Sequence, residues 1–170
     1  PGWIISRCLG MIAEQVLDAA RKSKVKIATA ESCTGGLVAA AMTEIPGSSD
    51  VFDRGFVTYS NEAKKQMLGV AAETLDAFGA VSEQVAKEMA EGAVLHSEAD
   101  LAVSITGIAG PGGSDHKPEG RVCFGLAVHG QNTLVETREF GAIGRSNVRQ
   151  KSADHALELL KSALTPIAKA

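Results

Sequence analysis

The chain has 170 residues, a length typical of one domain, and 45% of them are hydrophobic, which is enough to form a buried core. Charged residues make up 22% and the formal net charge is −3, which excludes an intrinsically disordered or strongly basic chain. A nucleic-acid partner is disfavoured, because duplex binders usually carry a basic patch and aromatic residues, at 4%, are too few to stack the bases of a single strand. We therefore expect one domain over residues 1–170.

Three further classes of protein are disfavoured by the cysteines, the histidines and the apolar runs. The three cysteines, an odd number without CxxC spacing, argue against a disulfide framework and for a reducing compartment, so we expect a cytoplasmic protein. The four histidines form no HxxxH or HxH pair, so no metal site is expected. No apolar run reaches the roughly 18 residues of a transmembrane helix, and the start of the chain is a poor signal peptide, so no membrane partner is expected.

The first third of the chain predicts a helix, a strand and a second helix. Apolar residues recur at helical spacing at Ile5, Leu9, Ile12, Val16 and Ala20, which indicates an amphipathic helix that ends near residue 23. Alternation over residues 25–29 predicts a strand. A turn over residues 31–36 follows, and the apolar run 37–42 predicts a buried helix.

The middle of the chain continues this alternation. A strand is expected over residues 55–59, after which Asn61 is expected to cap a short helix over residues 62–68. Ser82 is typical of an N-cap and precedes a helical apolar pattern that reaches His96.

The last third contains three expected strands and a long helix. A buried strand over residues 101–106 leads into a loop, 107–113, in which four of seven residues are glycine. Strands over 121–128 and 133–140 form an expected hairpin across residues 130–132, and the final helix starts near Arg145 with Ala153, Ala156, Leu157, Leu160 and Leu164 facing inward. The predicted fold class is therefore α/β, a layered α/β/α domain with a mixed sheet.

The turn AESCTGG, residues 30–36, lies where a strand passes into a helix. Ligands of open α/β sheets bind at the carboxyl ends of strands, where a helix N-terminus offers free N–H groups. Thr34 can cap that helix, and Gly35 and Gly36 leave their backbone accessible. Ser32 then stands where a nucleophile or an anion ligand is useful. The alternative is a plain strand-to-helix turn with a capping hydroxyl.

Two neighbours of Ser32 offer other chemistry. Cys33 is a rival nucleophile, although small buried cysteines are usually packing residues, so Ser32 is preferred. Glu31 is a single carboxylate, and one carboxylate does not make a glycosidase pair.

The segment Thr58–Lys65 can supply a general base. A lysine acts as a base when burial lowers its pKa, and Lys64 is the inward member of its pair because it shares a helix face with Met67 and Leu68. The alternative is a pair of solvated lysines. Tyr59 either donates to a substrate or ends a strand.

Two more segments can bind anions. Glycines after a strand, as in residues 104–114, can form a nest of N–H groups for a phosphate or an oxyanion, although the P-loop and dinucleotide signatures are absent. Arg145 and Arg149, one turn apart, can bind phosphate or carboxylate through a bidentate fork. A ligand-free turn and surface arginines are the respective alternatives.

Four motifs in a fixed order are more specific than any one of them. AESCTGG, GFVTYSNEAK, GAVSEQVA and SITGIAGPGG together resemble the C-terminal domain of the competence/damage-inducible CinA family, from about residue 10 to residue 163. Stand-alone members of that family are nicotinamide mononucleotide deamidases, so the resemblance implies hydrolysis of that small molecule to nicotinate mononucleotide and ammonia, in pyridine nucleotide recycling and without a metal or other cofactor. Small enzymes of this kind often associate, so a homo-oligomer is expected.

The resemblance also implies roles for residues. Ser32 and Lys64 match a nucleophile and its base, and Tyr59, Thr106 and Arg145 match active-site positions. Where family members often carry Gly-Asp-Arg, this chain has Ile143-Gly144-Arg145, so the acid is missing. The expected catalytic residues are Ser32, Lys64, Tyr59 and Thr106. The expected substrate-binding residues are Cys33, Thr34, Gly35, Gly36, Asn61, Gly107, Gly110 and Arg145.

Three other functions remain open at this point. The domain could bind a nucleotide in a regulatory role without catalysis, since the family's name records competence and DNA damage. It could be an amidase that uses the Cys33 thiol, or a small-ligand transferase that uses the glycine loops.

Overall fold

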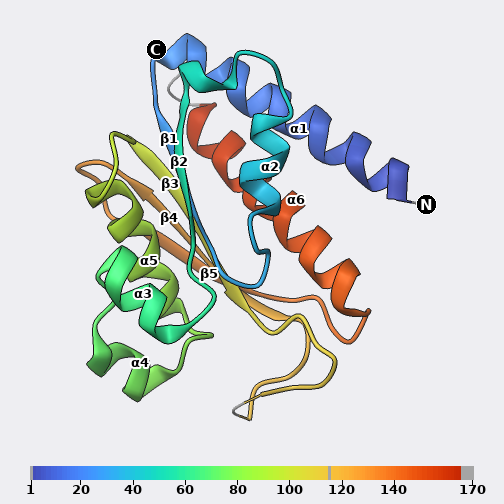
Figure 1. Cartoon of the computed structure of the whole chain (residues 1–170), viewed down its shortest axis with the longest axis vertical. Coiled ribbons are helices and arrows are strands. Elements are labelled where there is room, and N and C mark those ends of the chain that lie inside the picture. The colour runs from blue at the N-terminus through green and yellow to red at the C-terminus, as the bar shows by residue number, and fades with distance from the viewer. Residues whose placement is uncertain (1, 115, 166–170) are drawn as a thin grey trace.

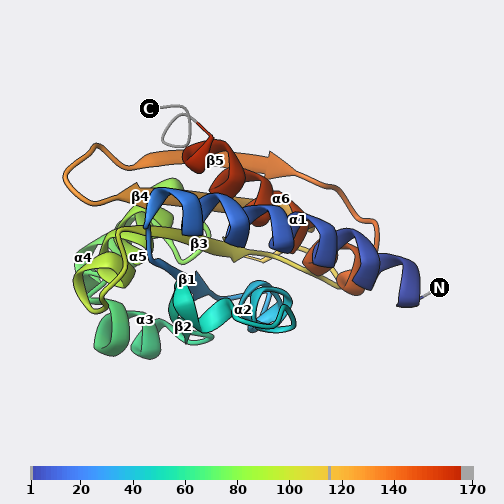
Figure 2. The same ribbon diagram turned by 90° about the horizontal axis from the view of Figure 1, so that it is seen from above.

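The computed structural model describes residues 2–114 and 116–165, with side chains described from Cys8 onward. A single five-stranded mixed sheet forms the middle layer of these residues, in the order β2-β1-β3-β4-β5 (Figures 1 and 2). The strands are β1 (Ile27–Glu31), β2 (Phe52–Val57), β3 (Leu101–Gly107), β4 (Arg121–Val128) and β5 (Leu134–Glu139). β1 pairs in parallel with β2 and β3, whereas β3, β4 and β5 pair antiparallel. The α/β class and the mixed sheet are confirmed.

Helices cover both faces of the sheet (Figure 1). One face carries α1 (Gly2–Ser23), α2 (Leu37–Thr43) and α6 (Arg145–Leu164), which pack on one another. The other carries α3 (Asn61–Leu68), α4 (Ala72–Phe78) and α5 (Glu83–Leu95), of which α5 lies against β3 and β4. A short 3-10 turn, η1 (Ser48–Asp50), leads into β2. Within the described residues, no helix is long and apolar enough to cross a membrane.

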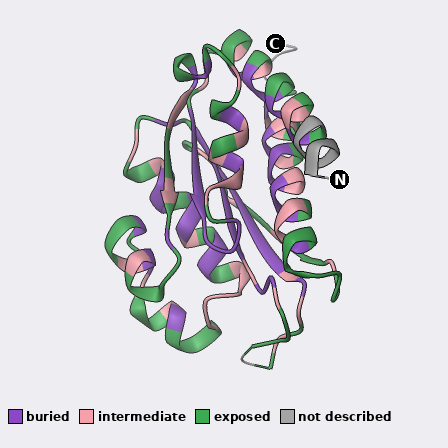
Figure 3. Ribbon diagram, turned by 45° about the vertical axis from the view of Figure 1, so that its right-hand side comes forward, coloured by how far each residue is buried: buried purple, intermediate pink, exposed green. Residues whose placement is uncertain are grey.

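The two faces of the sheet are packed differently because side chains alternate along each strand. Large residues such as Ile27, Val103 and Ile105 join the core under α1, α2 and α6. Ala28, Ala30 and Ala102 point the other way and let α5 approach closely. Figure 3 shows the resulting pattern, with buried strands in the middle and exposed outer faces on the helices.

Glycine makes two of the closest approaches on this second face. A Cβ at Gly125 of β4 would collide with the Ala86 carbonyl of α5, and one at Gly92 of α5 would collide with the Leu68 carbonyl of α3. The chain's many small residues therefore serve first to bring α5 and its neighbours against the sheet.

Most expected elements are confirmed, including the hairpin, the Ser82 cap and the inward face of α6, where Ala153, Ala156, Leu157, Leu160 and Leu164 are buried. In α1, Leu9, Val16 and Ala20 are buried and Ile12 is partly buried, whereas the side chain of Ile5 lies outside the described part.

Three expectations on the first half of the chain are wrong. β1 begins and ends two residues later than alternation predicts, because its pairing with β3 starts at Ile27, opposite Leu101, and continues to Glu31. β2 lies earlier than residues 55–59, because its ladder with β1 starts at Phe52. The cap of α3 is Ser60, not Asn61, since the Ser60 hydroxyl accepts from the Ala63 N–H. Helix α4 was not expected, and only one of its residues is buried.

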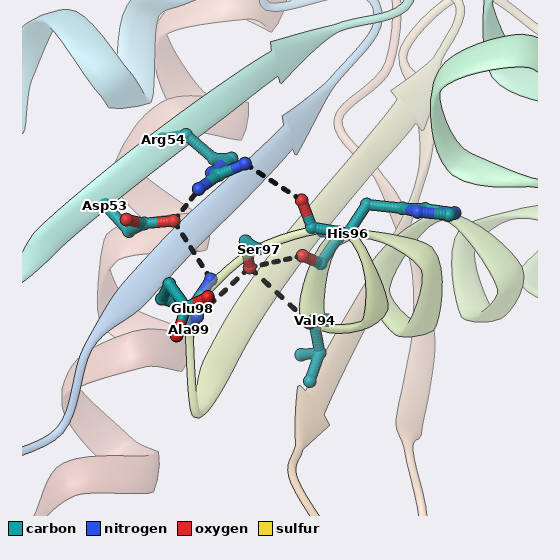
Figure 4. Close-up of polar contacts among 8 residues, drawn as sticks. Asp53, Arg54, Val94, His96, Ser97, Glu98 and Ala99 are labelled. Atoms are coloured by element: carbon teal, nitrogen blue, oxygen red, sulfur yellow. Dashed lines mark hydrogen bonds and ion pairs between the residues drawn. The ribbon is translucent and has the colours of Figure 1, made fainter.

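Edge strand β2 is tied to the end of α5 by a polar cluster (Figure 4). Asp53 Oδ2 accepts from Arg54 Nε at 2.6 Å and from the Glu98 N–H at 3.1 Å, and Arg54 also donates to the His96 carbonyl at 3.1 Å. Partial burial raises the pKa of Asp53, but these donors outweigh it and hold the pKa below its usual 3.8.

We expect Asp53→Asn to lower the free energy of unfolding at pH 7 by about 1 kcal/mol, because a charge-assisted contact is lost. A carboxylate with a depressed folded-state pKa stabilises above its unfolded pKa, and this contribution is lost as the pH falls through the folded value. The difference between the two proteins in urea denaturation should therefore shrink below pH 3.8. Asp76→Asn, on the exposed side of α4, is the control. A pH-independent difference would contradict this assignment.

Candidate active site

Ser32 and Lys64 meet at the carboxyl end of β1. The Ser32 N–H donates to the Ile105 carbonyl of β3 at 2.9 Å, which fixes the residue just beyond the paired strands. Lys64 Nζ lies 3.1 Å from Ser32 Oγ and 2.8 Å from the Thr58 carbonyl oxygen. The two side chains, 32 residues apart in sequence, are therefore within hydrogen-bonding reach.

The position of Lys64 follows from how α3 starts. The Ser60 cap begins the helix just after β2, and the buried positions of α3 are Lys64 and Leu68, one turn apart. Lys64 is only 1% exposed and is among the largest fully buried side chains. Burial disfavours the ammonium form and lowers the pKa of Lys64 from its usual 10.5, although the nearby Cys33 opposes this shift.

Burial shifts the pKa of Cys33 in the opposite direction from that of Lys64. Burial raises the pKa of its thiol to about 12, and the Glu31 carboxylate adds to the shift. Since only a thiolate is strongly nucleophilic, Cys33 is a protonated thiol at neutral pH and a poor rival to Ser32.

Glu31 caps α2 in place of the residue expected to do so. Its fully buried carboxylate accepts from the N–H groups of Val38 and Ala39 at 3.0 and 3.1 Å. The expected cap, Thr34, is wrong: Gly36 occupies the N-cap position with no side-chain hydrogen bond, and the buried Thr34 hydroxyl has no partner in the described structure. The N-terminus of α2, where the helix dipole favours an acidic group, is therefore occupied by the carboxylate of Glu31 and not by a ligand.

Arg149 of α6 is hydrogen-bonded to the backbone of the turn that follows Ser32. Its Nε donates to the Cys33 carbonyl at 3.0 Å and its guanidinium also donates to the Thr34 carbonyl at 3.1 Å. Gly35 and Gly36 adopt positive φ angles of 60° and 101°, which let the backbone turn beneath α6. Arg149 is thus occupied with the backbone of the turn.

A pocket of about 360 Å³ opens above Ser32. It brings together nine of the expected site residues, Ser32, Cys33, Tyr59, Asn61, Lys64, Thr106, Gly107, Gly110 and Arg145. The other three, Thr34, Gly35 and Gly36, are not among the residues that line it. Their side of the turn faces Arg149 and Val57 rather than the pocket.

Tyr59 and Arg145 form one side of this pocket. Arg145 donates to the Tyr59 hydroxyl at 2.7 Å and to the Gly110 carbonyl at 2.6 Å, so it links α6 to the segment between β2 and α3 and to the glycine-rich loop. Both side chains are exposed. The missing acid before Arg145 does not prevent this contact.

A second part of the pocket lining was not recognised in the sequence. Ala80 and Val81, from the segment between α4 and α5, line the pocket with Lys117. The Thr106 hydroxyl donates to the Ala80 carbonyl at 2.7 Å, and Lys117 Nζ donates to the carbonyls of Phe78 and Val81 at 2.7 and 2.5 Å. The motif GAVSEQVA contains Ala80 and Val81 and could have indicated that they line the site, but no motif around Lys117 indicates that this lysine does.

Metal-ligand groups are absent from the part of the chain that is described: no three His, Cys, Asp or Glu side chains gather to hold an ion. The pocket presents the buried amine of Lys64 beside the hydroxyl of Ser32. These are the components of acyl transfer through a serine nucleophile.

The profile of the CinA C-terminal domain matches residues 10–164. The chain belongs to the CinA C-terminal domain family. A crystal structure of the competence/damage inducible protein CihA from Agrobacterium tumefaciens is similar to this chain, with a TM-score of 0.89 and 48% sequence identity. The similarity covers 93% of this chain and 96% of CihA.

Curated relatives in this family differ in length. The chain is 51% identical over 153 residues to the nicotinamide-nucleotide amidohydrolase PncC of Escherichia coli K12, which covers 89% of this chain and 92% of PncC. It is 50% identical over 147 residues to a CinA-like protein of Chlorobium phaeobacteroides, but spans only 35% of that protein's length. A competence-damage inducible relative from Caldicellulosiruptor saccharolyticus is likewise covered to 37%. The chain thus spans about a third of such longer relatives and nearly all of PncC.

We expect Glu31→Gln to lower the free energy of unfolding by about 2 kcal/mol, because two backbone donors lose a charged acceptor in a buried place. Thr34→Val should change it by less than about 0.5 kcal/mol, because the Thr34 hydroxyl has no partner to lose. Thermal and urea denaturation of both variants measure the difference. Equal destabilisation by the two substitutions would show that Glu31 is not the cap.

Proposed function

We propose that this chain hydrolyses the carboxamide of nicotinamide mononucleotide to nicotinate mononucleotide and ammonia, in pyridine nucleotide recycling. The observation that carries the proposal is the 3.1 Å contact between the buried Lys64 amine and Ser32 Oγ at the base of a pocket. The 51% identity with PncC, across 92% of that protein, supports the choice of substrate.

Lys64 is the general base in the proposed first step. A neutral amine accepts the Ser32 proton while its own N–H stays on the Thr58 carbonyl, which orients the lone pair toward Oγ. Ser32 Oγ then bonds to the amide carbon and gives a tetrahedral intermediate. Lys64 returns the proton to the departing nitrogen, so ammonia leaves and an ester with Ser32 remains.

Water completes the reaction in the proposed second step. Lys64 takes a proton from the water, the hydroxide adds to the ester carbon, and the proton passes to Ser32 Oγ as nicotinate mononucleotide is released. The oxyanion of both intermediates is assigned to backbone N–H groups beside Ser32, of which the nearest in sequence is that of Cys33. The Gly35 N–H is excluded because it already donates to the Ser32 carbonyl.

Thr106 takes a positioning role in this scheme. Its buried hydroxyl donates its proton to Ala80 and so holds the pocket wall, which leaves the proton transfers to Lys64. The proposal thereby differs from the role that the family resemblance implies for Thr106.

Removing either member of the pair should abolish ammonia release. We expect Ser32→Ala and Lys64→Met each to lower kcat at least ~1000-fold, as when nucleophile or base is lost in other covalent hydrolases. Lys65→Met is the matched control, because Lys65 is the neighbouring lysine but points to solvent beside Glu62. Cys33→Ala should keep most of the activity, since a thiol with a pKa of about 12 supplies no thiolate.

The outcomes of this assay separate the competing functions. Near-normal turnover in Ser32→Ala would exclude the proposed pair, and loss of turnover in Cys33→Ala would favour the thiol amidase. Tight binding of the mononucleotide by the unmodified protein without any ammonia release would favour a regulatory binding domain.

The pH dependence of kcat/KM should report Lys64. The base works only when neutral, so the rate should rise with pH and level off above the pKa of Lys64 in the folded protein. Because burial lowers that pKa, the midpoint of the rise should lie below pH 10.5. Lys65→Met should leave the profile unchanged. A limb with an apparent pKa of 10.5 or higher would contradict the role of Lys64.

A further inference from the structure

The pocket above Ser32 is positively charged although the chain is acidic overall. Lys117 and Arg145 line it along with Lys64, and among the residues that the structure describes no Asp or Glu lines it. The formal net charge of the whole chain is −3, so this absence of carboxylates runs against the general composition. Lys64 is only 1% exposed and already contacts Ser32 Oγ and the Thr58 carbonyl. Lys117 and Arg145 are therefore the two cations that an entering ligand meets.

Neither cation is neutralised within the described structure. Arg145 donates to a carbonyl oxygen and a phenol, and Lys117 donates to two carbonyl oxygens. No ion pair among the described residues involves either of them. Four other arginines each form an ion pair with a carboxylate, namely Arg21, Arg54, Arg121 and Arg138. Neutral acceptors leave Lys117 and Arg145 with their full charge for an anion.

The glycine-rich loop connects the two cations. Its Gly110 carbonyl binds Arg145, and a bridge between Ser114 and Lys117 brings the loop back toward the pocket wall. The nearby acid, Glu119, is turned to the Gly112 N–H at 2.9 Å. One N–H group of the expected anion nest is thus already occupied, as is that of Ile108, which donates to Arg121. The loop's backbone is therefore a weaker candidate for an anion than the two side chains.

We propose that Lys117 and Arg145 together bind the phosphate monoester of the substrate. The proposal rests on the proposed function and names the part of the pocket that recognises the anionic end of the mononucleotide. On binding, each cation exchanges a neutral oxygen for a phosphate oxygen, which carries more negative charge and forms a stronger hydrogen bond. Arg145 offers a planar fork and Lys117 a compact charge, and both line the same pocket.

The test measures binding without turnover. In a Ser32→Ala background, isothermal titration calorimetry compares nicotinamide mononucleotide with nicotinamide riboside, which lacks the phosphate, and also uses ribose 5-phosphate alone. We expect Lys117→Met to weaken binding of both phosphorylated probes roughly 10- to 100-fold, as expected for loss of a charged hydrogen bond, and Arg145→Met to do the same. Lys117→Arg should restore much of the affinity. Lys151→Met, an exposed lysine of α6 outside the pocket, is the matched control.

The ratio of the mononucleotide and riboside affinities separates recognition from a structural effect. If Lys117 binds phosphate, Lys117→Met lowers that ratio by the same factor of roughly 10 to 100, because binding of the riboside is unaffected. If Lys117 only holds the wall through Phe78 and Val81, both affinities fall together, the ratio stays the same, and the proposal is overturned. Unchanged binding of ribose 5-phosphate in both variants would also overturn it.

The proposed function can fail independently of this subsite. A protein with Ser32 intact that releases no ammonia from the mononucleotide, while Lys117 is still required for ribose 5-phosphate, would reject the reaction and keep the phosphate subsite. Ammonia release with no dependence of binding on Lys117 or Arg145 would reject the subsite and keep the reaction.

Discussion

A lysine amine buried against a serine hydroxyl is the interaction on which the site depends. An ammonium group is costly to bury, so Lys64 is held where its neutral form is favoured and where the Thr58 carbonyl and Ser32 are its partners. The fold supplies that place by ending β1 and β2 side by side and starting α3 immediately after β2. The carboxyl ends of parallel strands thus deliver the two reacting groups to one point.

The charged residues around Ser32 fall into two groups, one that holds the backbone in place and one that faces the pocket. Glu31 and Arg149 are next to the turn, yet both are used on backbone groups, the first on the N–H groups of α2 and the second on carbonyl oxygens. Lys117 and Arg145 line the pocket and donate to neutral oxygens, and among the described residues neither forms an ion pair with a carboxylate. Glu31 and Arg149 therefore hold the backbone around Ser32 in place, whereas Lys117 and Arg145 are available to a ligand in the pocket.

Local patterns predicted the layered fold well, and the family resemblance added the pairing of Ser32 with Lys64. The inward position of Lys64 follows from its spacing to the buried Leu68 one turn later, whereas Met67, the other residue of the expected inward face, is exposed. The Glu31 cap was missed because its donors, Val38 and Ala39, are seven and eight residues away across a turn whose shape a sequence does not reveal. Lys117 was missed for the same reason on a larger scale, since its partner Val81 is 36 residues earlier. The bounds of β1 and β2 depended on pairing with neighbouring strands rather than on their own alternation.

The unequal burial of the three cysteines decides which reagents can modify this protein selectively. Cys33 and Cys123 are buried thiols whose pKa values are raised by burial, whereas Cys8 is exposed on α1, and none of the described side chains of α1 lines the pocket. A maleimide fluorophore or spin label therefore attaches at Cys8 and leaves the cavity open. Cys8 is thus the one exposed cysteine of this chain, so a probe can be attached there without first replacing Cys33 and Cys123.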